Sequence, residues 1–304
     1  MCIVLDYIEK YPLRTKQILG ITYEQLRSLT ESSIIRHREL EKFKENQKIR
    51  INAVGGGRPQ KLSFSAQVVL CLFYLRQMPS FEILGMLFGI SKTEANDTFH
   101  YWRKIIRNIL PASLLEEASK IDGELEVVQE FLTNYQLLVD SAEQPINRPS
   151  QPEEQKQYYS GKKKQHTRKN QIVSLPKAQD IVDVKVGFPG PTADIKLFSS
   201  QQEKFHIKQG FGGDKGYQGG KNIKTPHKKK RKQELSDAQK QENQRFSSNR
   251  IYIEHLIRLV KIFQIASRRF QLKRDVYNDI IFTVCGLVRL RIGSLILAFT
   301  EIRK

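Results

Sequence analysis

Three acidic residues stand where their carboxylates could hold divalent metal ions against a phosphodiester. Asp140 ends the apolar run 137–139, Asp214 ends the glycine-containing turn 211–213, and Glu254 lies in the pattern R-x3-E-x6-K. Carboxylate oxygens are the ligands that a hard cation such as Mg²⁺ prefers. Two such ions, about 3.5–4 Å apart, can activate an attacking oxygen and stabilise the leaving one. These residue types therefore indicate metal-dependent chemistry on a nucleic-acid backbone.

The pattern R-x3-E-x6-K places Arg250, Glu254 and Lys261 on one face of a helix. At about 100° per helical residue, Glu254 lies about 40° round the helix from Arg250, and Lys261 lies about 20° round. Two cations would then flank a carboxylate where DNA phosphates approach. A structural alternative stays open, because Glu254 could form an ion pair within the helix with Arg250 or Arg258 while the cations face solvent.

The two aspartates have different local settings. The carboxylate of Asp140 is expected to emerge at a strand end, unless Asp140 is only a turn or cap residue. Asp122 lacks a preceding strand and is more typical of a helix break. The glycines that flank Asp214 allow a ligand to approach the backbone closely, and Lys215 offers a phosphate contact. A plain glycine-rich turn is the alternative at Asp214.

An excess of positive charge indicates a polyanionic partner. The 304 residues include 51 Lys and Arg against 32 Asp and Glu, which gives a formal net charge of +19. Such an excess favours nucleic acid over a membrane surface, with a merely soluble basic protein as the alternative. Cations cluster at Lys162, Lys163 and Lys164 and again from His227 to Lys232. These runs are expected to contact backbone phosphates without reading bases, or else to form solvated loops.

Several classes of protein are excluded by composition. The three cysteines (Cys2, Cys71 and Cys285) form no C-x-x-C pair, which argues against a disulfide scaffold or a cysteine zinc site and suits a reducing cytoplasm. The first residues lack the charged and apolar regions of a signal peptide. The apolar stretch 280–300 is interrupted by Arg289 and Arg291, so it predicts a buried helix or helix pair and no membrane span.

Residues 1–110 are predicted to be helical and to contain a helix-turn-helix at about 63–104. Residues 22–25 have the sequence of a capping box. Further along, two short helices are expected to meet at Gly89, with Ser91 capping the second. The polar start of that second helix makes Lys92, Thr93 and Asn96 candidates for DNA contact. Residues 55–59 are expected to form a flexible basic joint.

The remainder of the chain predicts a helical connector at 111–135 and a mixed α/β domain at 136–304. Short β-branched or aliphatic runs indicate strands at 137–139, 171–175 and 181–186, before Asp214, and near 222–225. Thr192 or Asp194 could cap a helix that runs through Leu197. Residues 228–246 are expected to form an exposed basic excursion before the helix that carries Arg250.

Several motifs, taken in order, resemble those of the DDE transposases of bacterial insertion sequences, nearest to the insertion-sequence-5-like group. The motifs are Leu138-Val139-Asp140, Tyr159-Ser160-Gly161-Lys162-Lys163-Lys164, Pro189-Gly190-x3-Asp194, Gly213-Asp214-Lys215-Gly216-Tyr217 and Arg250-x3-Glu254-x6-Lys261. The resemblance covers nearly the whole chain. Two positions depart from the family pattern: Ser247 stands where the signature has tyrosine, and Ala193 where relatives often have histidine.

The resemblance implies an α/β catalytic domain with a ribonuclease-H-like mixed sheet, preceded by an all-α helix-turn-helix domain. It also implies that Asp140, Asp214 and Glu254 form the metal-binding triad. The expected cofactor is a divalent metal, two Mg²⁺ ions for which Mn²⁺ can substitute. The expected partner is double-stranded DNA, first the transposon ends and then the target. Lys215, Arg250 and Lys261 are expected to position phosphates.

The expected reaction is cleavage at the end of the element, which frees a 3′-hydroxyl that then attacks target DNA. Bringing two ends together implies at least a homodimer in the bacterial cytoplasm, associated with the nucleoid and with no membrane partner. Two alternatives remain. One is a repressor or domesticated relative that binds DNA without catalysis, and the other is a metal-dependent nuclease that does not transpose.

Overall fold

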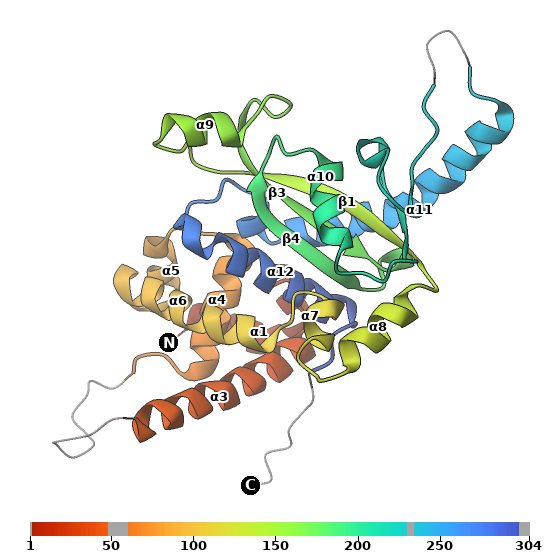
Figure 1. The fold of residues 1–304 in the computed structure, drawn as a ribbon. Helices are drawn as coiled ribbons and strands as arrows, with labels where there is room; N and C mark the ends of the chain where they lie inside the picture. The colour runs from red at the N-terminus through yellow and green to blue at the C-terminus, as the bar shows by residue number, and fades with distance from the viewer. Residues whose placement is uncertain (1, 48–59, 230–233, 298–304) are drawn as a thin grey trace. The chain divides into compact units, whose positions relative to one another are not determined.

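The computed structural model describes residues 2–47, 60–229 and 234–297, which belong to two compact units (Figure 1). The first unit comprises residues 1–110, 263–265 and 295–304, and the second comprises residues 111–262 and 266–294. The predicted joint at 55–59 lies outside the described residues.

The first unit is helical throughout its described residues. Its helices are α1 (Ile3–Lys10), α2 (Thr15–Ile18), α3 (Tyr23–Asn46), α4 (Phe64–Gln77), α5 (Phe81–Phe88) and α6 (Lys92–Ile109). The predicted capping box is present, because the Thr22 side chain accepts from the Gln25 backbone and the Gln25 side chain accepts from the Thr22 backbone. Ser63 caps α4 by accepting a hydrogen bond from the Ala66 amide.

A tight turn joins α5 to α6, as predicted. Gly89 ends α5 with a φ of 67°, a left-handed conformation that favours glycine. Ser91 then caps α6 by accepting from the Glu94 amide at 3.2 Å. A Cβ on Gly85 would lie 2.7 Å from the Ile90 carbonyl oxygen, so this close turn also requires glycine at 85. Helix α6 runs farther than expected, to Ile109, and buries Trp102 completely.

The second unit combines helices with a mixed sheet. Its strands are β1 (Gln136–Pro145), β2 (Tyr159–Ser160), β3 (Gln165–Ser174), β4 (Ile181–Pro189), β5 (Gly210–Gly212) and β6 (Ile223–Lys224). Its helices are α7 (Leu114–Ala118), α8 (Glu124–Leu132), α9 (Pro152–Tyr158), α10 (Asp194–Gln202), α11 (Asp237–Lys261) and α12 (Tyr277–Ile292). The chain also forms short 3-10 turns at Pro12–Arg14, Pro176–Ala178, Lys215–Tyr217, Gln264–Ala266 and Arg274–Val276.

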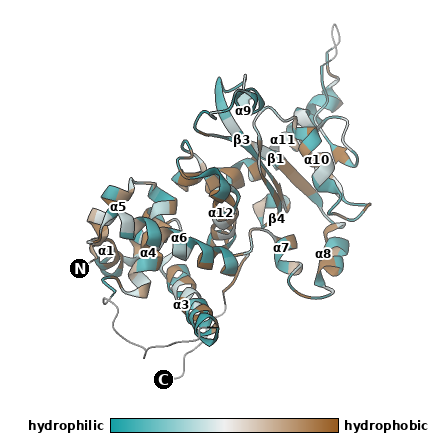
Figure 2. Cartoon of the chain, turned by 60° about the vertical axis from the view of Figure 1, so that its left-hand side comes forward, coloured by the Kyte–Doolittle hydropathy of each residue, from teal (hydrophilic) through white to brown (hydrophobic). Residues whose placement is uncertain are grey.

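The sheet is antiparallel on one side of β1 and parallel on the other. Strand β3 runs antiparallel to β1, β4 and β2, whereas β5 runs parallel to β1 and to β6. Figure 2 shows hydrophobic residues on strand β1 and also on helices such as α12. A helical region followed by a mixed sheet with helices confirms the predicted fold class.

The two faces of β1 follow the alternation of side chains along a strand. Leu137 and Val139 belong to a buried cluster that also contains Phe198 of α10. Leu138 lies on the other face, where its side chain and the Phe246 ring of α11 both approach Gly212. Helices α10 and α11 therefore cover opposite faces of the sheet around the β1–β5 pair.

The predicted helical connector at 111–135 contains two helices, α7 and α8. Three sequence-based expectations for this unit need correction. Neither Thr192 nor Asp194 caps α10, because the cap position is Ala193 and Asp194 is the first helical residue. Asp140 lies inside β1, not at its end. Helix α11 begins at Asp237 behind a capping box of Ser236 and Gln239, so much of the expected excursion is helical.

Helix α12 is anchored by a buried arginine, which explains the charge in its apolar sequence. The side chain of Arg289 is 0% exposed, and its Nε and Nη2 donate to Asp180 at 2.8 Å. Arg289 Nη2 also donates to Glu117 at 2.7 Å. No helix among the described residues is long and apolar enough to cross a membrane; residues 298–300 of the predicted helix lie outside them.

All three cysteines of the chain are buried as free thiols. Cys71 lies in α4 and Cys285 in α12, and both are completely inaccessible. Burial raises the pKa of the Cys71 thiol. These cysteines therefore behave as small hydrophobic core residues.

Candidate functional site

The register of two parallel strands brings Asp140 and Asp214 to the same level of the sheet. The β1–β5 ladder pairs Gln136 with Gly210 and ends where Leu138 pairs with Gly212. Asp140 stands two residues farther along β1, and Asp214 stands two residues beyond the end of β5. The β1–β3 ladder continues beyond this point to Pro145. Asp140 therefore lies where β1 loses its β5 neighbour, and this explains how a residue inside a strand can face a site.

Helix α11 supplies the third carboxylate on the face of the sheet that Asp140 shares with Leu138. Phe246 of α11 packs against Gly212 on this face, and Arg250 and Glu254 follow it at intervals of four residues. Residues spaced by four lie one above another on a helix. Side chains from β1, the β5 turn and α11 thus approach one another, although Asp140 and Glu254 are more than 100 residues apart in the sequence.

The charges around Asp140 affect the pKa of its carboxyl. That pKa is raised from 3.8 to about 6, first by burial and then by the nearby carboxylates Asp214 and Glu254. Two effects oppose this rise: the Ser141 amide donates to Asp140 Oδ1 at 2.8 Å, and Arg250 is close enough to attract the charged form. Asp140 is thus a crowded carboxylate that would gain from a cation.

The Arg250 guanidinium lies between the carboxylates and is mostly buried. Its Nη2 is 3.3 Å from Glu254 Oε1, with the Arg250 side chain 19% exposed and Glu254 54% exposed. Among the described residues, Arg250 Nε is a buried donor with no hydrogen-bond partner. The alternative in which Glu254 pairs with Arg250 is therefore realised, in addition to the electrostatic contact between Glu254 and Asp140.

The donor set fits a hard divalent cation, since it consists of carboxylate oxygens. Asp140 and Asp214 share one level of the sheet, and the repulsion between them is the kind that a bound cation relieves. Within the described residues, no three His, Cys, Asp or Glu side chains are already gathered so as to hold a metal ion. The structure thus brings the three predicted ligands to one region and leaves their side chains apart.

Asp214 is held in a compact glycine turn. Its Oδ1 accepts a hydrogen bond from the Gly216 amide at 2.8 Å, while Lys215 between them is exposed. A Cβ on Gly213 would come within 3.0 Å of the Tyr217 ring, so this position requires glycine. The buried Tyr217 hydroxyl has a raised pKa, first because of burial and then because Asp140 and Asp194 lie nearby.

The structure adds a fourth carboxylate, Asp194, that sequence reasoning treated as a possible helix cap. Asp194 Oδ1 accepts from the Ser141 hydroxyl at 2.6 Å and from Lys169 Nζ at 3.0 Å. In the sequence, the motif Pro189-Gly190-x3-Asp194 was the one feature that pointed to a role for Asp194. Its setting depends on the pairing of β1 with β3, which a local pattern does not specify.

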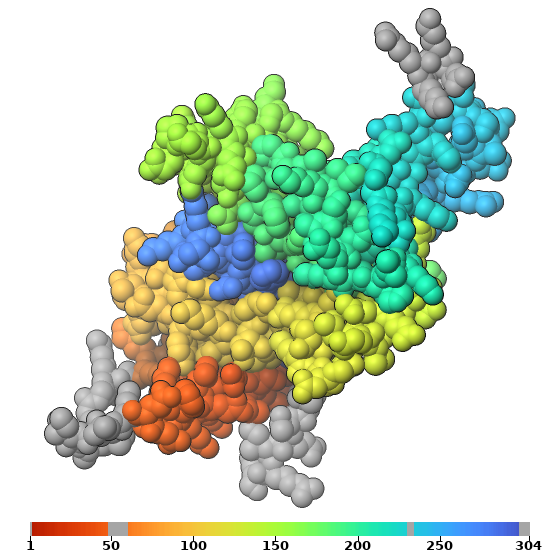
Figure 3. Space-filling model, in the orientation of Figure 1, coloured from red at the N-terminus to blue at the C-terminus, as the bar shows by residue number. Residues whose placement is uncertain are grey.

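A hollow of about 450 Å³ opens beside this carboxylate and is lined by several predicted DNA-contacting lysines. Lys162, Lys163 and Lys261 contribute to its wall together with Ser141 and Asp194. Lys164 is exposed in the same turn as Lys162 and Lys163. In Figure 3 the bright green segment that contains these turn lysines borders the blue-green segment that contains α10.

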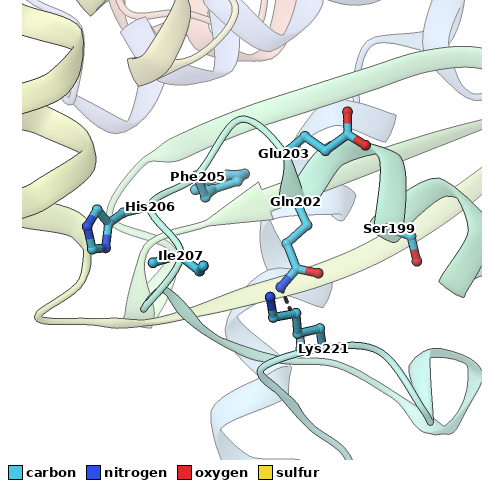
Figure 4. A pocket seen from close by; sticks show the side chains of 7 residues that line it. All are labelled: Ser199, Gln202, Glu203, Phe205, His206, Ile207 and Lys221. Carbon is cyan, nitrogen blue, oxygen red and sulfur yellow. Dashed lines mark hydrogen bonds between the residues drawn. The ribbon is translucent and has the colours of Figure 1, made fainter.

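A second hollow lies at the other end of α10 and holds none of the predicted site residues. Its volume is about 240 Å³, and Phe205 and Ile207 line part of it. Figure 4 shows the hydrogen bond from Gln202 Nε2 to the Lys221 carbonyl oxygen across this hollow.

The remaining predicted contacts belong to the first unit. Lys92 and Thr93 are exposed in the first turn of α6, and Asn96 is half-buried one turn farther on. They occupy the start of the second helix of the helix-turn-helix, where side chains can reach base edges.

Comparison with known proteins gives two family matches and one close sequence relative. Residues 139–289 match the family model "DDE superfamily endonuclease", and residues 60–112 match "Helix-turn-helix of DDE superfamily endonuclease". A probable transposase for insertion sequence element IS702 of Microchaete diplosiphon is 32% identical over 219 residues. That alignment covers 71% of this chain and 76% of the relative.

Solved structures of the Mos1 transposase show only a slight similarity. A paired-end complex with the left transposon end has 11% identity and a TM-score of 0.23, covering 84% of this chain and 83% of that one. A mariner Mos1 paired-end complex with Mg has 12% identity and a TM-score of 0.21, covering 85% of each chain. TM-scores this low support no conclusion about the present chain.

Proposed function

We propose that this chain, which belongs to the DDE superfamily of endonucleases and is the transposase of an insertion sequence, cuts and joins transposon DNA with metal ions held by Asp140, Asp214 and Glu254. Membership of the family implies a divalent metal. We further propose two Mg²⁺ ions that Mn²⁺ can replace, and the carboxylate donor set supports a hard cation of this kind.

One observation carries the site assignment: strand register places Asp140 and Asp214 at one level, next to the α11 face that carries Glu254. When bound, the metal would activate the attacking oxygen and stabilise the leaving one. Asp140 and Asp214 would hold the metal from the sheet, and Glu254 would complete the second position from α11. Arg250, close to these carboxylates, would orient a phosphate oxygen of the DNA.

Lysines around the 450 Å³ hollow would guide the DNA backbone toward the carboxylates. Lys162, Lys163 and Lys261 line it, Lys164 follows in the same turn, and Lys215 projects from the Asp214 turn. Such contacts position DNA without reading its sequence. We assign sequence reading to Lys92, Thr93 and Asn96 in the helix-turn-helix at residues 60–112.

The proposed substrates are the two ends of the element and then target DNA, each as double-stranded DNA. Cleavage would free a 3′-hydroxyl, which the same carboxylate site would present to the target strand. Two ends handled together call for two active sites, so we propose that the chain works as a homodimer.

The test uses purified protein, DNA that carries the inverted repeats flanking its gene, and Mg²⁺. Asp140→Asn should abolish cleavage and strand transfer while DNA binding, measured by fluorescence anisotropy, stays unchanged. Asp122→Asn is the matched control, because Asp122 is an exposed aspartate outside the site; it should cleave like the wild type.

Three outcomes would contradict the proposal in different ways. Equal cleavage by Asp140→Asn would refute the site assignment. Specific binding by the wild type with no cleavage would favour the non-catalytic repressor. Cleavage without strand transfer would favour a nuclease that does not transpose.

A further inference from the structure

We propose that Lys169, Asp194 and Ser141 form a positioning device that sets the placement of the Asp140 and Asp214 carboxylates and thereby the affinity for the divalent metal. This inference rests on the proposed function, because it assumes that Asp140 and Asp214 bind metal. Asp194 is not assigned as a metal ligand here; it acts on the ligands through Ser141 and through the Asp214 turn.

One carboxylate oxygen of Asp194 accepts two hydrogen bonds. Asp194 Oδ1 accepts from Ser141 Oγ at 2.6 Å and from Lys169 Nζ at 3.0 Å. Lys169 also donates to the Thr192 carbonyl oxygen at 2.6 Å, which ties the loop before α10 to β3. The Lys169 side chain is 8% exposed and that of Asp194 is 26% exposed. A pair this buried has a defined geometry, and removing one partner leaves a costly unpaired charge.

Ser141 connects Asp194 to Asp140. The Ser141 amide donates to Asp140 Oδ1 at 2.8 Å, while its hydroxyl donates to Asp194. Successive side chains of a strand point to opposite faces, so Asp194 holds this part of β1 from the α10 face while Asp140 faces α11. Loss of the Asp194 contact would free β1 at the residue next to a metal ligand.

The other carboxylate oxygen of Asp194, Oδ2, lies against the Asp214 turn. A Cβ built on Gly216 would lie 3.1 Å from Asp194 Oδ2 and 2.9 Å from Asp214 Oδ1. The two oxygens are therefore no farther apart than the sum of these distances. Gly216 also donates its amide to Asp214 Oδ1. Asp194 thus lies beside both metal-binding segments, and the chain from Lys169 fixes it there.

Groups that orient metal ligands change metal affinity by about 10-fold to 100-fold when they are removed. We therefore expect Asp194→Asn, Ser141→Ala and Lys169→Met each to weaken binding of Mn²⁺ to the DNA-free full-length protein by about tenfold. Free Mn²⁺ would be counted by electron paramagnetic resonance at a temperature where every variant is folded.

The matched control is Asp180→Asn. Asp180 also accepts from a cation and a serine hydroxyl, those of Arg289 and Ser294, but it belongs to the anchor of α12. This change should lower the melting temperature without altering Mn²⁺ affinity. The double variant Ser141→Ala with Asp194→Asn should bind Mn²⁺ no more weakly than Asp194→Asn alone, because both changes break one chain.

The results separate this inference from its rivals. Unchanged Mn²⁺ affinity in Ser141→Ala and Lys169→Met, with a loss only in Asp194→Asn, would make Asp194 a metal ligand and overturn the positioning role. Additive effects in the double variant would overturn it as well. If Asp140→Asn binds Mn²⁺ as the wild type does, the proposed function itself fails at its metal site, whatever Asp194 does.

Discussion

At the scale of one residue, Asp140 shows that a site suited to a cation lowers the stability of the folded protein when the cation is absent. Its carboxyl has a pKa of about 6 because it is buried beside Asp214 and Glu254. The folded protein keeps a proton that the unfolded protein releases above a pH of about 4. The stability that this bound proton contributes to the folded protein is therefore fully present below a pH of about 4. It is lost as the pH rises through about 6.

Replacement of this carboxyl should therefore stabilise the folded protein, although the same change abolishes its proposed activity. In metal-free buffer at pH 7.5, we expect Asp140→Asn to raise the free energy of unfolding by about 1–2 kcal/mol, allowing for partial access of solvent. Urea denaturation at pH 7.5 and at pH 3.5 measures the effect. An equal difference between the two proteins at both pH values would show that charge burial is not its cause.

Gly216 is a second residue whose small size serves the site. A methyl group there would meet Asp214 Oδ1 and Asp194 Oδ2 at about contact distance or closer, so both carboxylates would have to shift. We expect Gly216→Ala to lower Mg²⁺-dependent cleavage by about 10-fold to 100-fold. The measurement is single-turnover cleavage of end DNA.

Gly210→Ala provides the control for Gly216→Ala. Gly210 begins the strand that leads to the same turn, and nothing lies within 4 Å of a Cβ built on it. Its cleavage rate should match that of the wild type. Equal losses in both variants would point to a general effect on folding of the β5 region.

At the scale of elements, the start of α6 should carry the sequence recognition. Asn96 lies one turn into this helix, and a well-placed amide contact to a base contributes about 1–3 kcal/mol of discrimination. We expect Asn96→Ala to bind end DNA about tenfold more weakly or worse, with unrelated DNA bound as before. Competition binding assays compare the two DNAs.

A matched control substitution for Asn96→Ala is available at the other end of α6. Asn108 is an exposed asparagine three turns farther along the same helix. Asn108→Ala should leave the preference for end DNA intact. A loss of preference in this variant equal to that of Asn96→Ala would remove the assignment of sequence recognition to the start of the helix.

Caps and alternation predicted many of these elements because their causes are local. Ser91 with Gly89 marked the turn before α6, and both are used as expected. Elements with weaker local signals were missed: α9 and β2 have no strong periodicity, and the first turns of α11 are so polar that they resembled a loop. The relation of Asp140 to Asp214 needed the parallel register, and the role of Asp194 needed a contact across two strands.

At the scale of the whole molecule, the charge of +19 predicts DNA binding that weakens steeply with salt. Each phosphate contact in B-DNA contributes about 0.9 to the slope of log affinity against log salt. We expect the triple change of Lys162, Lys163 and Lys164 to alanine to lower this slope by roughly 2–3. Binding titrations at several salt concentrations measure it.

The control removes the same charge elsewhere in the second unit. Lys196, Lys208 and Lys221 are exposed and lie away from the 450 Å³ hollow. Their change to alanine should alter the slope by less than about 1. Equal changes for the two sets would mean that net charge alone, without a defined path for DNA, determines binding.

The burial of every cysteine has a practical consequence for following this protein at work. The native thiols, which are buried in α4, in α12 and at the residue before α1, leave maleimide dyes little to react with. A single cysteine placed on the surface, for example at Lys196 or Asn108, could then be labelled selectively without first removing the native ones. Fluorescence from such a probe would report each step on the DNA in a chain otherwise unaltered.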